Sequence, residues 1–443
     1  EPIAALRQAL EDNGNQVADG HLQFATYEGC CEDDATCLGN NPSTPYGTYV
    51  IPKIPGQAPH DDLFEPWGAL DDPNMTRTFR LREDEALIFI GRTPPAARYL
   101  GIRSYLTTRL ELDGTLRPVL ASLGPSLNNL VIAADRDVAD SALWDQPFIV
   151  VTTADAAVEA AVHQHLEQAG YDPATIHDDR ITHEVVRMGI DEASDTFFML
   201  WRIAIDTDPA AGQAYRDDPK ATVLRVTPNE AGLALDPHPY PALEIPGTGA
   251  GEQGWQASYD ALEAAIIASY PDHSHLGLVG SAADYPATLE CIDEPDGCKT
   301  DLRDRYSALV PYFALDDPGD VAVVFGVNHA RTGKALYANF ALIDEAHQIG
   351  FAGVNSDDMV GSARAYLPDD PRVDDLYAYT IARECAGQIQ PCVEVPLMCP
   401  GVSDGERLRL TFRAYLEPST GAAPLKAELI PDKLTRFWIP NQQ

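Results

Sequence analysis

The sequence contains little lysine. Lys and Arg together number 31 in 443 residues, against 68 Asp and Glu, which gives a net charge of −37. The lysines are Lys53, Lys220, Lys299, Lys334, Lys426 and Lys433. A surface this negative repels phosphate backbones and anionic lipid headgroups. We therefore expect no nucleic-acid partner and no membrane insertion. Such a charge is also typical of proteins in salty surroundings, where repulsion between carboxylates is screened.

Long apolar runs and nucleotide-binding motifs are missing too. No run approaches the ~20 apolar residues that a membrane-spanning helix needs. No G-x-G-x-x-G follows a strand pattern and no G-x-x-x-x-G-K-[ST] occurs, so we expect no nucleotide cofactor. The chain opens without a signal-peptide pattern, and we expect it to be the mature form of an exported protein.

Cysteine is used in a way that indicates disulfides. The eight cysteines fall into three groups: Cys30, Cys31 and Cys37; Cys291 and Cys298; and Cys385, Cys392 and Cys399. Their even number, in segments rich in Pro, Gly, Asp or Asn, predicts an extracellular or periplasmic protein. A zinc site is the alternative, but no paired C-x-x-C with a second half follows. We predict a local Cys291–Cys298 bridge and a connection between the first group and the last.

The hydrophobic patterns change in blocks along the chain. Alternating apolar residues predict strands from 77 onward, again at 321–343 and again at 407–418. The middle of the chain instead alternates between strand and amphipathic-helix patterns. We predict an α+β fold, with a mainly antiparallel β core built from both halves of the chain, a central α/β insert and disulfide-pinned loops.

The expected domain organisation follows these blocks. The segments are 1–75, an N-terminal helix and Cys-rich loop region; 76–124, the first part of the β core; 125–235, the α/β insert; 236–300, a helix and Cys-containing connection; and 301–443, the second part of the β core with a Cys-rich segment.

Two distant segments share one plan. DEALIFIGRTPPAARYLGIRSYL (84–106) and DVAVVFGVNHARTGKALYANFAL (320–342) both read as strand, basic turn and strand. Aligning Ala86 with Ala322, with two extra residues in the later turn, pairs Tyr99 with Tyr337. An internal duplication would explain the match. The alternative is chance, because apolar strands resemble one another.

The candidate catalytic residues lie in or beside these two turns: Arg92, Arg98, Tyr99, Asn328, His329, Lys334 and Tyr337. An imidazole that titrates near neutrality can act as a general base. Cationic side chains can hold a carboxylate or an oxyanion, and tyrosine hydroxyls can donate hydrogen bonds. The alternative interpretation is that both turns are hairpin loops whose basic residues pair with the abundant Asp and Glu.

A metal site is a further hypothesis. His273 and His275 are two residues apart, and in an extended segment such residues share a face. With Asp272 or Asp284 they could form part of a site for zinc or another transition metal, although no clear third ligand follows. An exposed polar turn is the alternative. DDATCLGNN (33–41) and EPDG (294–297) could hold calcium only loosely, because the full calcium-loop spacing is absent.

Two classes of function fit this sequence. The first is an exported, cofactor-independent enzyme, for which we expect a hydrolase of a small-molecule or polymeric substrate, with His329 as base and Arg and Lys as clamps. The second is a non-catalytic extracytoplasmic binding or scaffold protein, in which the same residues form structural ion pairs. For the enzyme, we expect His329→Ala to abolish activity and leave the melting temperature nearly unchanged.

Overall fold

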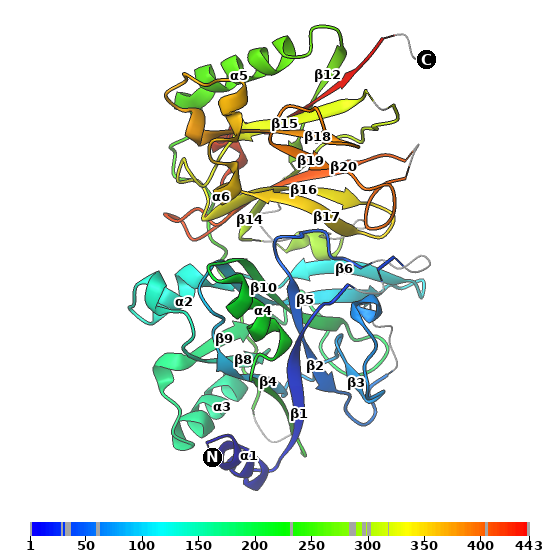
Figure 1. Cartoon of the computed structure of the whole chain (residues 1–443). Coiled ribbons are helices and arrows are strands. Elements are labelled where there is room, and N and C mark those ends of the chain that lie inside the picture. The colour runs from blue at the N-terminus through cyan, green and yellow to red at the C-terminus, as the bar shows by residue number, and fades with distance from the viewer. Residues whose placement is uncertain are drawn as a thin grey trace. The chain divides into compact units, whose positions relative to one another are not determined.

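The computed structural model describes residues 2–27, 30–31, 37–58, 63–230, 234–282, 289–294, 298, 303–317, 319–403 and 406–440. The chain forms two compact units: unit 1 contains Glu1–Thr26, Pro45–Leu243 and Tyr285–Arg303, and unit 2 contains Tyr27–Thr44, Glu244–Asp284 and Asp304–Gln443. Strands make up the body of each unit, with α-helices packed against the sheets (Figure 1).

Unit 1 is built on one continuous sheet. Its strands are β1 (Asn15–Phe24), β2 (Tyr46–Pro52), β3 (Met75–Thr76), β4 (Ala86–Arg92), β5 (Ala97–Leu110), β6 (Leu116–Ser122), β7 (Leu127–Asn128), β8 (Pro147–Thr153), β9 (Ile176–Arg180), β10 (Thr196–Asp206) and β11 (Thr222–Pro228). The order is β6-β5-β10-β2-β1-β11-β4-β8-β9, with β3 beside β2 and β7 beside β5. Its helices are α1 (Pro2–Asp12), α2 (Asn129–Asp135), α3 (Ala156–Gln168) and α4 (Pro209–Asp217).

Unit 2 contains two separate sheets. Its strands are β12 (Ser274–Val279), β13 (Ser281–Ala282), β14 (Arg305–Leu309), β15 (Val321–Val327), β16 (Tyr337–Asp344), β17 (Ile349–Asn355), β18 (Leu376–Ala382), β19 (Cys392–Glu394), β20 (Arg409–Tyr415) and β21 (Lys433–Trp438). The sheets have the orders β12-β21-β15-β18-β19 and β13-β14-β20-β16-β17. The helices are α5 (Gln256–Ala268) and the short α6 (Ser356–Met359).

Short 3₁₀ helices occur in both units. They are η1 (Glu65–Trp67), η2 (Asp140–Ala142), η3 (Pro173–Thr175) and η5 (Glu290–Ile292) in unit 1, and η4 (Gln253–Trp255), η6 (Ser362–Ala365), η7 (Val373–Asp375) and η8 (Lys426–Glu428) in unit 2.

The two units repeat one topology. In unit 1, residues 15–20 of β1 pair with β11 and residues 21–24 pair with β2, so β1 joins two half-sheets, β1-β11-β4-β8-β9 and β1-β2-β10-β5-β6. The two sheets of unit 2 repeat these half-sheets: their corresponding strands follow the same order in space and the same order along the chain. Among the described residues, each unit has one parallel edge pair, β8–β9 or β18–β19, and one α-helix before its first strand. The repeated plan expected from the sequence is therefore confirmed at the level of strand order.

The sequence match was nevertheless wrong in two details. Within the described chain β4 does not pair with β5, nor β15 with β16; each connection crosses from one sheet or half-sheet to the other, so neither is a hairpin. Phe89 faces the core between the half-sheets, whereas Phe325 faces α5. Because successive strand residues point to opposite faces, the proposed alignment of these strands is shifted by an odd number of residues.

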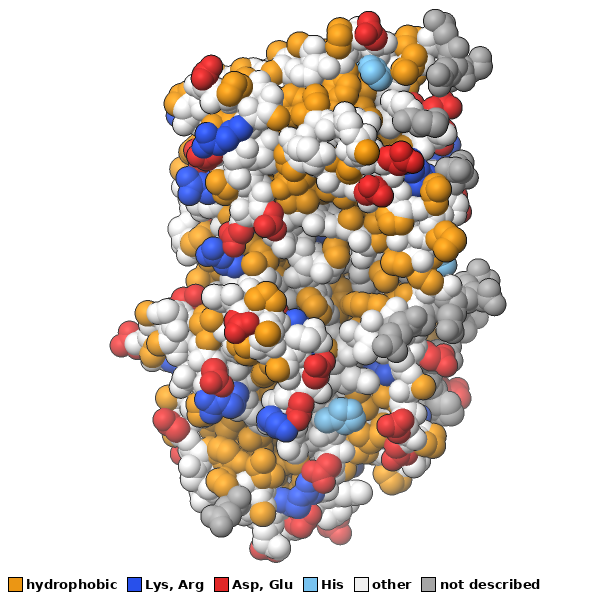
Figure 2. Space-filling model, in the orientation of Figure 1, with side chains coloured by type: hydrophobic (Ala, Val, Ile, Leu, Met, Phe, Trp, Pro, Cys, Tyr) orange, Lys and Arg blue, Asp and Glu red, His pale blue; other side chains and the backbone are white. Residues whose placement is uncertain are grey.

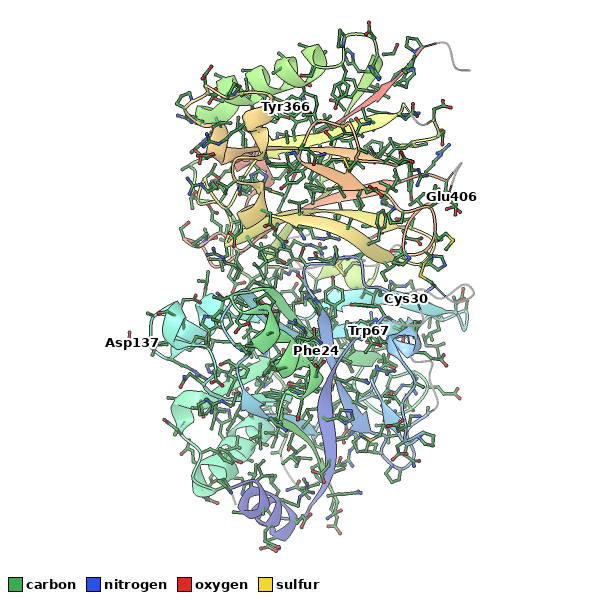
Figure 3. The ribbon with its side chains drawn as sticks, viewed as in Figure 1. Phe24, Cys30, Trp67, Asp137, Tyr366 and Glu406 are labelled. Atoms are coloured by element: carbon green, nitrogen blue, oxygen red, sulfur yellow. A yellow bond between two sulfur atoms is a disulfide. The ribbon has the colours of Figure 1, made fainter. Side chains whose placement is uncertain are left out.

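Both faces of the central strands are buried, which explains their continuous apolar runs. In β4, Leu87 lies in the core between the half-sheets, and Ile88 lies beneath α1 and α3. In unit 2, Val324 lies between the sheets and Val323 beneath α5, where Tyr366 also packs (Figure 3). Each such side chain contributes about 1.5–3 kcal/mol through burial.

The observed fold is β-rich and mainly antiparallel, as expected, but its strands are divided differently. Strands β8, β10 and β11 belong to the same sheet as β4 and β5, so the middle of the chain does not form a separate insert. Strands β15, β16 and β20 pair only within unit 2 among the described residues. The single core drawn from both halves is thus replaced by two cores. Strand β8 pairs in parallel with β9 across α3, and it also pairs antiparallel with β4, which local sequence does not reveal.

All eight cysteines form disulfides: Cys30–Cys37, Cys31–Cys399, Cys291–Cys298 and Cys385–Cys392. The predicted Cys291–Cys298 bridge and the link between the first and last groups are both confirmed. Cys31 and Cys399 are 368 residues apart in sequence and both lie in unit 2. Within the described ranges, no helix is long and apolar enough to cross a lipid bilayer.

Candidate functional site

The connection between β15 and β16 carries three of the candidate residues in a compact turn. The backbone N–H groups of Lys334 and Ala335 both donate to the His329 carbonyl, at 2.9 and 3.1 Å. Gly333 has a φ of 81°, a left-handed conformation that glycine adopts without strain. This turn directs the side chains of Asn328, His329 and Lys334 inward, where they are 0%, 3% and 6% exposed.

His329 lies between two buried carboxylates. Its Nδ1 is 2.8 Å from Glu252 Oε1, and its Nε2 is 3.3 Å from Asp432 Oδ2. Glu252 directly precedes η4, and Asp432 directly precedes β21. Glu252 also accepts hydrogen bonds from the Thr332 hydroxyl at 2.6 Å and the Ile430 N–H at 2.9 Å. Both ring nitrogens of His329 are therefore occupied by acidic partners.

Gly326 in β15 provides the space for this arrangement. Asp432 Oδ1 accepts a hydrogen bond from the Tyr377 hydroxyl at 2.8 Å. A Cβ atom at Gly326 would lie 2.1 Å from Asp432 Oδ1 and 2.8 Å from the Tyr377 ring. The glycine thus allows Asp432 and Tyr377 to pack against the strand beside His329.

The carboxylates hold His329 in its charged form. Burial lowers the pKa of His329, but Glu252 and Asp432 raise it more, and its pKa lies well above the usual value. For Glu252 the signs are reversed: burial raises its pKa and the His329 imidazolium lowers it. The net effect is a lowered pKa of Glu252. A histidine that is already protonated at neutral pH cannot accept a proton from a substrate. This geometry does not support the expected role of His329 as a general base.

The hydrogen-bond donors of Lys334 are also all used. Its Nζ donates to Glu428 Oε2 at 2.5 Å, Glu417 Oε1 at 2.7 Å and Thr248 Oγ1 at 2.9 Å. An ammonium group has three donors, so no hydrogen of Lys334 remains for an oxyanion or a substrate carboxylate. Burial raises the pKa of Glu428, but Lys334 and the N–H groups of Thr248 and Gly249 lower it to about 2.

The two ion-pair sets are joined through the backbone. The Glu252 N–H donates to the Glu428 carbonyl at 2.9 Å. The His329 set and the Lys334 set each place two carboxylates around one cation. Together they form a buried charged network, defined here as Glu252, His329, Lys334, Glu417, Glu428 and Asp432, which connects the β15–β16 turn to the chain before α5 and the segments after β20.

The free energy of unfolding should depend on pH through this network. The unfolded chain loses the His329 proton near pH 6.5, about the usual value for histidine, whereas the folded chain keeps it. The stabilisation that the charged His329 gives to the folded chain is therefore complete below about pH 6.5, and it is lost as pH rises through the pKa of His329 in the folded chain. The Glu428 contribution is complete above about pH 4.5 and is lost as pH falls through about 2.

Thermal unfolding between about pH 3 and pH 9 measures this dependence. We expect the wild-type chain to lose stability above about pH 6.5 more steeply than His329→Gln, which lacks the titrating group. Equal alkaline slopes in the two proteins would contradict the assignment.

The remaining site candidates occupy different surroundings. In unit 1, the exposed Arg92 has its Nε 2.7 Å from Asp145 Oδ1, Arg98 is exposed and Tyr99 is fully buried. In unit 2, Tyr337 stacks on Tyr415 with ring centroids 4.5 Å apart.

The structure therefore brings together only part of the predicted set. His329 and Lys334 join one network, while Asn328 Nδ2 donates instead to the Ser356 carbonyl at 2.8 Å. Arg92, Arg98 and Tyr99 belong to unit 1, and the other candidates to unit 2.

Sequence reasoning missed the acidic members of the network. Glu252, Glu417, Glu428 and Asp432 carry no motif, and they belong to a total of 68 acidic residues. The equivalent connection in unit 1, residues 93–96, has the sequence TPPA and contains no ionisable side chain. The repeated topology can therefore be built without charges at this connection, so the network is a feature of unit 2 that the fold itself does not demand.

The expected metal sites find little support. No third His, Cys, Asp or Glu gathers with His273 and His275 among the described residues, and His275 instead lies on β12 near the Phe437 ring. Asp284 lies outside the described residues, as do 33–36 and 295–297 of the suggested calcium segments. The described residues contain one group with metal-ligand spacing, Asp344, His347 and Cys399.

Comparison with known proteins assigns the chain to no family. No protein-family model and no curated protein matches the chain. A search of solved structures returns the N-terminal CBM22-1–CBM22-2 tandem domain of Paenibacillus barcinonensis Xyn10C, at 9% identity, over 96% of this chain and 98% of that chain, with a TM-score of 0.14. A TM-score this low establishes no shared fold.

Proposed function

We propose that this chain is a non-catalytic extracytoplasmic binding or scaffold protein built from two copies of one β topology. The observation that carries the proposal is the saturation of its most promising catalytic residues. Both ring nitrogens of His329 face buried carboxylates, and the three donors of Lys334 are used by the buried Glu417 and Glu428 and by the exposed Thr248. Catalysis by these groups would require a substrate to displace carboxylates from a buried site, which leaves charges uncompensated.

The disulfides support an extracytoplasmic location. Four bridges include every cysteine of the chain. Disulfides persist in oxidising compartments and are rare where glutathione and thioredoxin keep thiols reduced. An extracellular or periplasmic location is therefore part of the proposal.

The charge limits the partners. Acidic side chains are scattered over the visible face rather than gathered in one patch (Figure 2). A net charge of −37 disfavours anionic polymers and favours neutral or cationic ligands. The partner we propose is a neutral or cationic small molecule or polymer, and nucleic acid is excluded from the proposal.

A hydrolase remains the second candidate because of two buried acceptors. Asn328 Oδ1 and Glu417 Oε2 are two of the many buried polar atoms, in both units, that have no hydrogen-bond partner among the described residues. Buried polar atoms are normally satisfied, so such exceptions occur at functional sites or where water enters. Both atoms belong to residues at the β15–β16 turn or its ion-pair partners, where a catalytic site would have to be.

A substrate panel separates the two candidates. We expect no turnover above the buffer rate of chromogenic esters, glycosides, phosphoesters and peptides between about pH 5 and 8, the range in which an imidazole base works. Arg331→Ala serves as the matched variant, because Arg331 lies on the same turn with 53% of its side chain exposed. Turnover by the wild type that Arg331→Ala removes without shifting the melting temperature would support the hydrolase and overturn the scaffold.

A further inference from the structure

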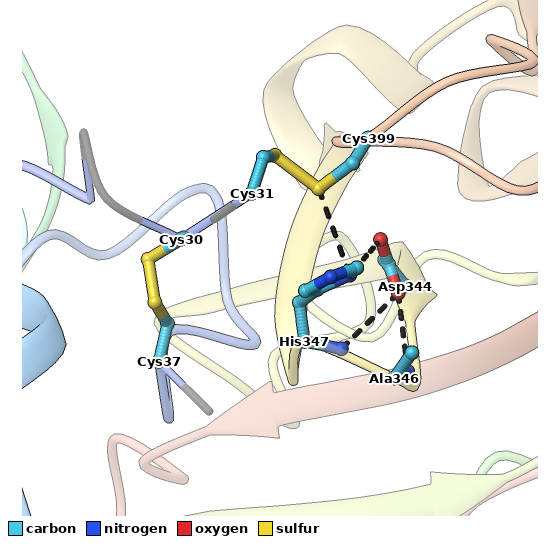
Figure 4. Close-up of a disulfide and its surroundings, with 7 residues drawn as sticks. All are labelled: Cys30, Cys31, Cys37, Asp344, Ala346, His347 and Cys399. Carbon is cyan, nitrogen blue, oxygen red and sulfur yellow. Dashed lines mark hydrogen bonds and ion pairs between the residues drawn. A yellow bond between two sulfur atoms is a disulfide. The ribbon is translucent and has the colours of Figure 1, made fainter. Parts of the chain in front are cut away.

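A cluster of metal-ligand atoms lies beside the Cys31–Cys399 disulfide (Figure 4). His347 Nδ1 is 2.8 Å from Asp344 Oδ2 and 3.6 Å from Cys399 Sγ. One ligand atom from each of these three residues lies within 4.8 Å of the others. Asp344 is buried, while His347 and Cys399 are partly exposed, so ions from solvent can reach the cluster.

Backbone contacts hold the cluster in place. Asp344 Oδ1 accepts the N–H groups of Ala346 and His347, at 3.1 and 3.2 Å, which fixes the turn between β16 and β17. The Cys37 N–H donates to the His347 carbonyl at 2.9 Å, and Gly39 forms a parallel bridge with Ile349. The segment that carries Cys31 is therefore attached to the same turn by hydrogen bonds that do not depend on the disulfide.

The disulfide prevents metal binding in the present state, because the thiolate is the metal ligand. Two electrons and two protons from a dithiol reductant convert the bridge into two thiols, and the reductant becomes a disulfide. The products are Cys31 and Cys399 side chains, each with a sulfur that can lose its proton to a metal ion.

The spacing then matches zinc. Zn–S and Zn–N bonds of about 2.3 and 2.0–2.1 Å place sulfur and nitrogen about 3.5 Å apart in a tetrahedron, close to the 3.6 Å between Cys399 Sγ and His347 Nδ1. The His347–Asp344 separation must widen by about 0.5 Å for the same geometry. The Cys31 sulfur is not one of the three atoms that lie within 4.8 Å of one another, so it must turn towards them after reduction. Two sulfurs, one imidazole nitrogen and one carboxylate oxygen then form a four-coordinate set.

We propose that reduction of Cys31–Cys399 creates a zinc site whose ligands are Cys31, Cys399, His347 and Asp344. Zinc binding releases the two thiol protons and replaces the covalent connection between residues 31 and 399 with a metal link. The site is a latent second state of this corner of unit 2 and is independent of the function proposed above.

Cobalt binding to Cys31→Ala tests the ligand set without a reductant. This variant frees the Cys399 thiol, keeps the other three disulfides and retains three ligands. We expect it to bind one Co²⁺, with the sulfur-to-cobalt charge-transfer absorption that wild type lacks, and to gain thermal stability when Zn²⁺ is added. Adding His347→Ala or Asp344→Asn should weaken binding by roughly tenfold or more, whereas His275→Ala should not. Binding that is absent, or unchanged by both ligand substitutions, overturns the proposal.

The native chain gives a second measurement. Wild type and Cys31→Ala/Cys399→Ala, each reduced with dithiothreitol and desalted without oxygen, differ only in the proposed thiols and share the other six cysteines. We expect wild type to bind one more Zn²⁺ per chain than the double variant. Equal zinc contents would overturn the proposal even if Cys31→Ala fails to fold.

Discussion

Replacing His329 with alanine is expected to lower the free energy of unfolding by about 3–5 kcal/mol, the usual cost of removing one partner from a buried ion pair. The imidazolium lies between Glu252 and Asp432, which are 1% and 4% exposed in their side chains. Without it, two carboxylates face each other in a site that water does not reach. Each must then be protonated or draw water into the core, and either response destabilises the folded state.

This outcome reverses the expectation drawn from sequence, in which His329→Ala leaves stability unchanged. Urea unfolding of wild type and variant measures the difference. Arg364→Ala is the control, because Arg364 pairs with Asp374 at the surface of the same unit, with side chains 56% and 41% exposed. The control should lose about 1 kcal/mol or less. Equal small losses in both variants would show that the His329 network contributes little to folding.

Replacing Lys334 with methionine is expected to have an effect of similar size, about 3–5 kcal/mol. Methionine approximates the length of the lysine stem but removes the charge that compensates Glu417 and Glu428. These carboxylates are 2% and 8% exposed in their side chains and contact the ammonium at 2.7 and 2.5 Å. The folded variant must therefore protonate at least one of them, so its instability should be greatest at neutral pH and smaller in acid.

A variant that removes the charge of Lys334 together with the charges of its two carboxylate partners distinguishes the effect of charge from that of the specific hydrogen bonds. In Lys334→Met/Glu417→Gln/Glu428→Gln, no uncompensated charge remains, and we expect much of the lost stability to return. Lys433→Met is the control, because Lys433 pairs with Glu263 where both side chains are about one-quarter exposed, at 25% and 27%. A triple variant that is no more stable than Lys334→Met would indicate that the lysine acts through its specific hydrogen bonds rather than its charge.

Local sequence was sufficient for several helices and for the Cys291–Cys298 bridge. The N-terminal helix expected within 1–75 is α1, and the helix expected within 236–300 is α5. Asp155 belongs to a residue type that favours helix starts, and it caps α3 by accepting the N–H groups of Ala157 and Val158. These features depend on neighbours within a few residues, so periodicity and capping preferences identify them.

The repeat shows where local information stops. The matching of 84–106 with 320–342 correctly pointed to two units of one design, but it misplaced the strand register and the nature of the turn. A strand buried on both faces has no polar side to show which face meets which neighbour. Strand order depends on pairings such as β4 with β11, whose residues lie more than a hundred positions apart.

The sequence by itself determined a negatively charged, disulfide-bonded, β-rich chain with a repeated strand pattern, because charge, cysteine spacing and apolar periodicity are properties of composition and near neighbours. Only the tertiary structure decided the state of the candidate residues. The carboxylates that surround His329 are 77 and 103 residues away, and those that hold Lys334 are 83 and 94 residues away. Burial beside these partners converts an available base and clamp into a charged structural network, since a group's chemistry follows from the charges and solvent around it.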